Sequence, residues 1–336
     1  MKNTFKETIK AIATDEKLHT SLLYSLSRMT VDSLEIFKQE WPEVSIARRQ
    51  EIIRELIEIA ETNFEVDFTP IFLLGLADID ETVRASSLKG LWGEEDTALI
   101  KPLIYLFQTD EAPSVRAAAA TTLGQYIYLS EIEEIPAEAV EPIKEALLEA
   151  IYQADEAVDV RRRAIEAIAY LGDDNINPII ENAYYDSNEK FQISAVFAMG
   201  RNGDAKWKPI VLDELSNPNS EIRFEAARSC GELEMNEAVE KLITLISDDA
   251  DLEVQEMAIW SLGRIGGSLA REALAACIEG DNESLAVAAE AALEELNLFS
   301  GDWELFDFDE TDGEFDDMLL DFDDLNGSNN QQGYLH

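Results

Sequence analysis

The sequence predicts an all-α protein: an α-solenoid, or superhelix of antiparallel helix pairs, followed by a disordered acidic C-terminal tail. A pattern of Val/Ile-Arg-x-x-Ala-x-x-x-Leu-Gly recurs about every 30 residues between about residue 70 and residue 296. A short Asp/Asn turn precedes most copies, and the pattern stops after Leu298. A fixed period built from helix pairs is typical of a solenoid, which is first of all a surface for other molecules.

The repeats align on one position, here called the anchor, which is most often Arg. Successive anchors lie 32, 45, 31, 31, 32 and 31 residues apart, and a small residue follows each of them three positions later. Small side chains at that place let helices of neighbouring repeats approach closely. The anchors are Arg84, Arg116, Arg161, Gln192, Arg223, Gln255 and Ala286.

The turn before each anchor predicts how the second helix of a pair begins. Four positions before the anchor, five copies hold a residue whose side chain caps a helix by accepting hydrogen bonds from free amides. These residues are Asp80, Asn188, Asn219, Asp251 and Asn282. Six positions before the anchor stand Asp78, Asp110, Asp155, Asp186, Asn217 and Asp249. We expect them to form a ladder of Asp–Arg bonds between repeats, weaker toward the C-terminus, where Gln and Ala replace Arg.

This pattern resembles HEAT repeats, specifically the short HEAT-like repeats of phycobilisome lyases, over about residues 64–297. The resemblance implies the fold strongly and function weakly. It leaves open a bilin lyase-like enzyme or lyase subunit, which attaches or detaches chromophores on cysteine. HEAT-like iron-dependent hydroxylases rely on His-Glu pairs, which this chain lacks.

Three regions follow from where the pattern starts, breaks and stops. Residues 1–63 are expected to form an N-terminal helical cap or degenerate repeat, and residues 64–299 a solenoid of seven repeats. Residues 300–336 form the acidic-aromatic tail. The 45-residue spacing indicates an insertion near residues 126–140. Two interpretations of the insertion stay open: a partner-binding loop, or a lengthened helix with an acidic surface.

Charge and composition exclude several classes of function. The chain has 70 Asp and Glu against 26 Lys and Arg, a net charge of −44. Twelve of these negative charges fall in residues 302–336, which leaves −32 on the rest. Binding to nucleic acid or to an anionic membrane is therefore disfavoured, whereas a basic protein partner fits. No stretch is long and apolar enough to span a bilayer.

The sequence offers no recognisable catalytic, cofactor-binding or metal-binding residues. His19 and His336 lie at opposite ends, and no phosphate-binding loop or metal-spaced cysteine pair occurs. We expect Cys230 and Cys277 to be free thiols in a reducing compartment, which favours a cytoplasmic protein.

A stripe of aromatic and Arg side chains is the first candidate binding site. Positions one, five and nine after the anchor share one face of the second helix, which generally lines the concave side of such repeats. In the central repeats this stripe holds Arg162, Tyr170, Phe197, Arg201, Phe224, Arg228, Trp260 and Arg264. Aromatics and Arg dominate binding hot spots. The alternative stays open that Phe197, Phe224 and Trp260 pack between repeats as core.

The acidic-aromatic tail is the second candidate binding site. It mixes carboxylates with large apolar residues, as disordered interaction motifs do. Four of these residues lie at helical spacing and suit a groove. The candidate residues are Trp303, Phe306, Phe308, Phe315, Met318, Leu319 and Phe322.

Together these features predict a non-catalytic protein-interaction scaffold or adaptor that binds partners on the concave face, through the tail, or both. Self-association of the tail with the groove is a further expectation. The alternatives are a chaperone-like assembly factor for a basic client and the bilin lyase-like enzyme.

Overall fold

A computed structural model of the chain describes residues 2–173 and 175–300. Residues 1–296 form one compact unit. Residues 297–336 form a second unit, whose described part is the end of the last helix. The described residues form α-helices and short 3-10 turns without a strand, which confirms the all-α prediction. The tail that was predicted to be disordered lies outside the described residues beyond Ser300.

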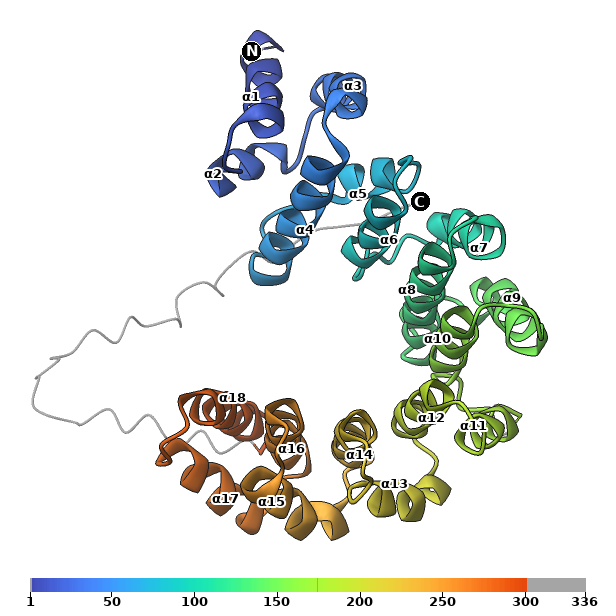
Figure 1. The fold of residues 1–336 in the computed structure, drawn as a ribbon, viewed down its shortest axis with the longest axis vertical. Coiled ribbons are helices and arrows are strands. Elements are labelled where there is room, and N and C mark those ends of the chain that lie inside the picture. Colours follow the sequence, from blue (N-terminus) through green and yellow to red (C-terminus); the bar gives the residue numbers. More distant parts are fainter. Residues whose placement is uncertain (1, 174, 301–336) are drawn as a thin grey trace, which may run out of the picture. The chain divides into compact units, whose positions relative to one another are not determined.

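Within residues 1–296 the helices form two layers that run alongside each other (Figure 1). The chain opens with α1 (Lys2–Thr14) and α2 (Thr20–Leu23). From there on, the first helix of each pair lies in the outer layer. These helices are α3 (Val31–Glu40), α5 (Thr69–Gly75), α7 (Ile100–Thr109), α9 (Glu141–Tyr152), α11 (Asn177–Tyr184), α13 (Lys208–Glu214), α15 (Val239–Asp248) and α17 (Ser268–Ile278).

The second helix of each pair lies in the inner layer and packs against the second helix of the next pair. These helices are α4 (Ile46–Thr62), α6 (Glu81–Gly90), α8 (Pro113–Glu131), α10 (Val158–Ile168), α12 (Glu189–Asn202), α14 (Ser220–Glu232), α16 (Leu252–Ile265) and α18 (Glu283–Ser300). This stack of helix pairs confirms the predicted α-solenoid.

The apolar core lies between the two layers, and the small residues after the anchors belong to it. All seven are fully buried: Ser87, Ala119, Ala164, Ala195, Ala226, Ala258 and Ala289. Close approach also explains one glycine of the pattern. A Cβ atom at Gly124 would lie 2.9 Å from the Cα atom of Ala167, so α8 and α10 touch only because that side chain is absent.

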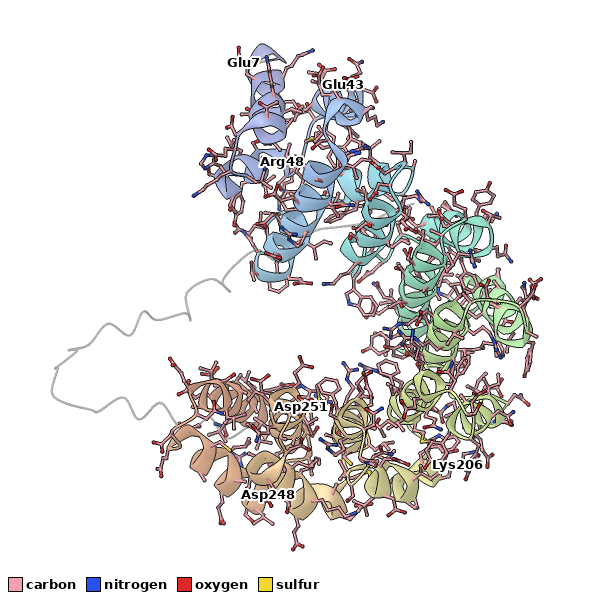
Figure 2. All side chains as sticks on the ribbon, in the orientation of Figure 1. Glu7, Glu43, Arg48, Lys206, Asp248 and Asp251 are labelled. Carbon is pink, nitrogen blue, oxygen red and sulfur yellow. The ribbon has the colours of Figure 1, made fainter. Side chains whose placement is uncertain are left out.

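The five predicted capping residues all accept a hydrogen bond from an amide of the first helical turn. The donors are Val83 for Asp80, Lys190 for Asn188, Glu221 for Asn219, Glu253 for Asp251 and Ser284 for Asn282. Asp251 at the start of α16 is labelled in Figure 2. These bonds satisfy amides that a helix leaves free at its start, so the Asx residues set where the inner helices begin.

The ladder between repeats is present, with the anchor of one repeat bound to the carboxylate of the next. Nε and Nη2 of Arg84 donate to Asp110 at 2.8 Å each, and the same two nitrogens of Arg223 donate to Asp249 at 2.6 and 2.7 Å. A third nitrogen of each Arg donates to a carbonyl oxygen of its own turn. Arg49 adds a rung in α4, where its guanidinium lies 2.6 Å from Asp78.

Ser45 caps this helix by accepting a hydrogen bond from the amide of Arg48. Arg48, labelled in Figure 2, donates to the carbonyl oxygen of Asp15 and so ties α4 to the end of α1.

Two rungs differ from the prediction. Arg116 pairs with Glu156 at 2.6 Å and not with Asp155, which is exposed, so the carboxylate of this rung stands five and not six positions before the next anchor. Arg161 does not form the expected rung to Asp186. Its guanidinium instead lies 5.0 Å from the ring centre of Phe191 and donates to the carbonyl oxygen of Ile151.

The two Gln anchors keep the hydrogen bond within their own repeat but lack the ion pair with the next repeat. Gln192 and Gln255 donate to the carbonyl oxygens of Asp186 and Asp249 at 2.7 and 2.8 Å within their own repeats. A neutral amide there makes no ion pair with the next repeat. The prediction of a weaker ladder is right at these two positions, but Arg223 keeps a full rung between them.

The residues inserted between the second and third anchors extend α8 to Glu131. They also add a turn and the 3-10 segment Ala137–Ala139 ahead of α9. The extension carries Tyr128 on α8 into contact with the inner side of the next repeat, where its ring centre lies 5.5 Å from that of Tyr170.

Candidate functional site

Five residues of the predicted stripe alternate ring and guanidinium on the inner layer, and are here called the arginine stack. Arg201 lies between Tyr170 and Phe197, at 5.5 and 5.3 Å from the ring centres. Arg228 lies between Phe197 and Phe224, at 5.2 and 5.8 Å. The stack therefore runs without a break from the turn after α10 across α12 to α14.

Carboxylates hold the two guanidinium groups of the arginine stack from the side. Glu232 lies 3.2 Å from Arg201 and 3.9 Å from Arg228, so it bridges α12 and α14. Glu225 lies 3.2 Å from Arg228. With rings above and below and carboxylates beside them, both Arg side chains are fixed before any partner arrives.

The rings of the arginine stack are neither core nor fully exposed. Phe197 and Phe224 each keep part of their surface open to solvent, as do Tyr170 and Trp260. Phe197, Phe224 and Trp260 are partly buried, so both alternatives, an exposed stripe and packing between repeats, stay open. A cavity of about 110 Å³ opens beside Phe224, lined also by Ile193, Glu225 and Val254.

Burial changes the acid–base behaviour of the carboxylates beside the arginine stack. It raises the pKa of Glu225 to about 7, and the attraction of Arg228 only partly offsets that effect. Burial raises the pKa of Glu232 as well, against the attraction of Arg201 and Arg228. The net charge of this surface therefore changes close to neutral pH.

The other three stripe residues stand apart from the arginine stack. Arg162 bonds Asp159 at 2.7 Å on its own helix and lies 3.4 Å from buried Glu166. Trp260 lies against the backbone of α14, since a Cβ atom at Gly231 would sit 2.9 Å from its ring. Arg264 lies 3.5 Å from Glu295 on α18.

Sequence reasoning missed two members of this surface. Tyr128 comes from the inserted residues, whose helical register was not predictable from the repeat. Glu225 stands two positions after its anchor, outside the positions used for the stripe, and only its distance to Arg228 reveals its role. The tail residues Trp303, Phe306, Phe308, Phe315, Met318, Leu319 and Phe322 lie outside the described residues.

The described residues hold no group of three or more His, Cys, Asp or Glu side chains that is arranged to bind a metal ion. Among the helices that the structure describes, none has the length and hydropathy needed to cross a membrane.

Comparison with known families agrees with the repeat seen in the sequence. Residues 209–294, which run from α13 into α18, match a family model described as HEAT repeats. The helix pairs between residues 209 and 294 are HEAT repeats. The resemblance proposed from the Arg, Ala and Gly positions is thereby confirmed for this part of the chain. The arginine stack reaches into it through Phe224 and Arg228.

Several solved structures are similar at low identity. Escherichia coli YibA is 17% identical with a TM-score of 0.43, over 84% of this chain and 98% of YibA. The CpcE–CpcF complex of phycocyanin lyase from Nostoc sp. PCC7120 is 18% identical with a TM-score of 0.44, over 68% of this chain and 94% of that one. Human deoxyhypusine hydroxylase is 15% identical with a TM-score of 0.33, over 88% and 97%. Similarity this low says nothing about activity. No curated protein matches the chain by sequence.

Proposed function

We propose that the chain is a non-catalytic protein-interaction scaffold and that the arginine stack on the inner layer is its main contact with a protein partner. The observation that supports this proposal most is the alternation of three partly exposed rings with two fixed guanidinium groups across α10, α12 and α14. Nothing in the packing of the repeats requires this arrangement, because other inner helices stack without it.

The physical argument is one of preorganisation. Tyr, Trp and Arg are the residues that most often dominate binding energy at protein interfaces. A long Arg side chain normally loses conformational entropy when it is immobilised on binding. In the arginine stack the rings and Glu232 already hold Arg201 and Arg228, so a partner loses less free energy to that ordering.

The paired charges also indicate the kind of partner. Because Glu232 and, above its raised pKa, Glu225 balance the charge of the two guanidinium groups, the surface attracts a partner mainly through its rings and the small cavity beside Phe224. We therefore expect an apolar or aromatic protein segment as the ligand, in a complex that changes little with salt.

A chaperone-like role for a basic client is the second candidate, and the net charge of −44 favours it. In that case the exposed carboxylates and not the arginine stack carry the binding, so the complex weakens steeply as salt rises. A cytoplasmic location is part of either proposal, supported by the two free cysteines. The bilin lyase-like alternative rests on the family resemblance alone.

Capture of partners from the cytosol of the source cells tests these proposals. The full chain is compared with the Phe197→Ala/Phe224→Ala variant and with a Tyr152→Ala control, which removes a ring that is 71% exposed on outer helix α9. We expect the stack variant alone to lose the partner, at about 0.1 M and about 0.5 M salt alike. Equal capture by all three proteins would exclude the arginine stack, and loss in high salt only would favour the chaperone.

A further inference from the structure

The cavity beside Phe224 has apolar walls to which three successive inner helices contribute. Ile193 of α12 and Phe224 of α14 are partly buried, and Val254 of α16 is fully buried. The volume of the cavity is about 110 Å³. An apolar cavity of about 150 Å³ holds one benzene molecule, so this one takes a single side chain of a partner. We call it the Phe224 cavity.

The charged residues that line the Phe224 cavity are all acidic. They are Glu221 and Glu225 of α14 and Asp251 and Glu253 of α16. Glu225 is paired with Arg228 at 3.2 Å. Asp251, labelled in Figure 2, caps α16 by accepting a hydrogen bond from the amide of Glu253. Glu221 and Glu253 are exposed, and neither carboxylate forms an ion pair with a Lys or Arg among the described residues.

A partner that contacts the arginine stack also covers this acidic rim, because Phe224 belongs to both. Contact then removes water from the carboxylates of Glu221 and Glu253. A carboxylate that loses water without gaining a cation is strongly destabilising, so an apolar side chain in the cavity would oppose binding. Lys and Arg combine an apolar stem with a charged end, and one such side chain satisfies both the walls and the rim.

We propose that the Phe224 cavity binds one lysine or arginine side chain of the protein segment that contacts the arginine stack. The stem packs against Ile193, Phe224 and Val254. The charged end lies between the carboxylates of Glu221 and Glu253. This proposal rests on the proposed function and adds to it that the segment carries a cation beside its apolar or aromatic residues. A partly buried pair is screened less than exposed charges, so the complex still changes little with salt.

A phage-displayed library of random peptides tests this proposal on the full chain. Selection at about 0.5 M salt suppresses the general attraction of basic peptides to a chain of net charge −44. Peptides that no longer bind the Tyr170→Ala/Phe197→Ala variant are kept. This variant removes two rings of the arginine stack but none of the residues that line the Phe224 cavity.

We expect the kept peptides to share a Lys or Arg at one position beside an aromatic or apolar residue. The Glu221→Gln/Glu253→Gln variant should bind them about fivefold more weakly. Replacing the cation of the peptide by norleucine should weaken binding to the wild type by a similar factor, with no further effect in that variant. The control is Glu240→Gln/Glu272→Gln, which removes two exposed carboxylates from outer helices α15 and α17 and should leave binding unchanged.

Peptides that depend on the arginine stack but share no cation would overturn this proposal and leave the proposed function standing. Additive effects of the norleucine and Gln replacements would also overturn it, since the cation would then lie elsewhere. An equal loss in the control would assign the cation to the overall charge of the chain. A library without any peptide that depends on Tyr170 and Phe197 would refute the arginine stack as a protein contact, and this proposal with it.

Discussion

Replacing Arg223 by Gln isolates the contribution of one rung to the stability of the solenoid. The chain supplies its own reference, because Gln already occupies the anchor at positions 192 and 255 and there donates to the carbonyl oxygen six residues earlier. In Arg223→Gln we therefore expect the bond to the carbonyl oxygen of Asn217 to survive. What is lost is the two-bond pair to Asp249, at 2.6 and 2.7 Å.

The magnitude follows from the burial of the pair. The side chains of Arg223 and Asp249 are 16% and 3% exposed. Removing one partner of a buried ion pair costs about 3–5 kcal/mol when the other charge stays uncompensated. Asp249 keeps a 3.0 Å hydrogen bond from the amide of Asp251, which partly compensates its charge, so we expect a smaller loss of about 2–3 kcal/mol. Adding Asp249→Asn to Arg223→Gln removes the uncompensated carboxylate and should restore about 1 kcal/mol of the free energy of unfolding.

Urea unfolding measures the total decrease in the free energy of unfolding. Hydrogen exchange in α14 and α16 shows whether the decrease arises at this junction, because each interface in a solenoid stabilises mainly its own neighbours. Arg223 holds the pKa of Asp249 below its usual value. The stability that this shift provides is present above the ordinary pKa of Asp and disappears as pH falls through the lowered one. The difference between wild type and Arg223→Gln should shrink in the same acid range. A loss below about 0.5 kcal/mol, or a double variant no more stable than the single one, would refute the reasoning.

Three further predictions concern other parts of the structure. Glu225 has its pKa raised to about 7 from 4.5, so the folded state binds the extra proton between those values and stability falls as pH rises through them, by about 3 kcal/mol. Glu225→Gln should flatten that part of a pH titration of urea midpoints, and an unchanged slope would contradict it. Gly124→Ala places a methyl group 2.9 Å from the backbone of Ala167 and should cost about 1–3 kcal/mol, measured by thermal unfolding. Burial raises the pKa of the Cys230 thiol to about 12, so in the native protein at pH 8 it should react with a thiol reagent far more slowly than Cys277, and equal rates would show that the site opens.

The sequence predicts the fold well because the residues that determine the packing of each repeat lie within a few positions of one another. Asp80 and its four counterparts determine where inner helices begin, and the small residue after each anchor determines where helices touch. These rules act within a few residues, so they survive in a single sequence. The shift from Asp155 to Glu156 was not predictable, because the two carboxylates are adjacent and no local pattern specifies which of them lies toward Arg116.

The candidate site was predictable only in its residue types. The periodicity placed Phe197, Arg201, Phe224 and Arg228 on one helix face. Their alternation depends on the distance and rotation between helices, which no local pattern specifies. The cavity lined by Phe64 and Trp92 was not predicted for a related reason, since both rings stand in loops after the helices and outside the helical periodicity.

The ladder has gaps, and two of them coincide with the absence of a carboxylate in the next repeat. Gln192 faces a repeat whose turn offers the neutral Asn217, and Gln255 faces one with Gly280 at that position. Arg161 turns to Phe191 instead. The junctions α10–α12 and α12–α14 therefore lack the anchor rung found at α6–α8 and α14–α16, and the arginine stack crosses both of them. At α12–α14 the pair of Arg201 and Glu232 joins the two repeats instead. The arginine stack thus connects repeats that the ladder leaves unconnected, so its side chains contribute to the stability of the solenoid as well as to its surface.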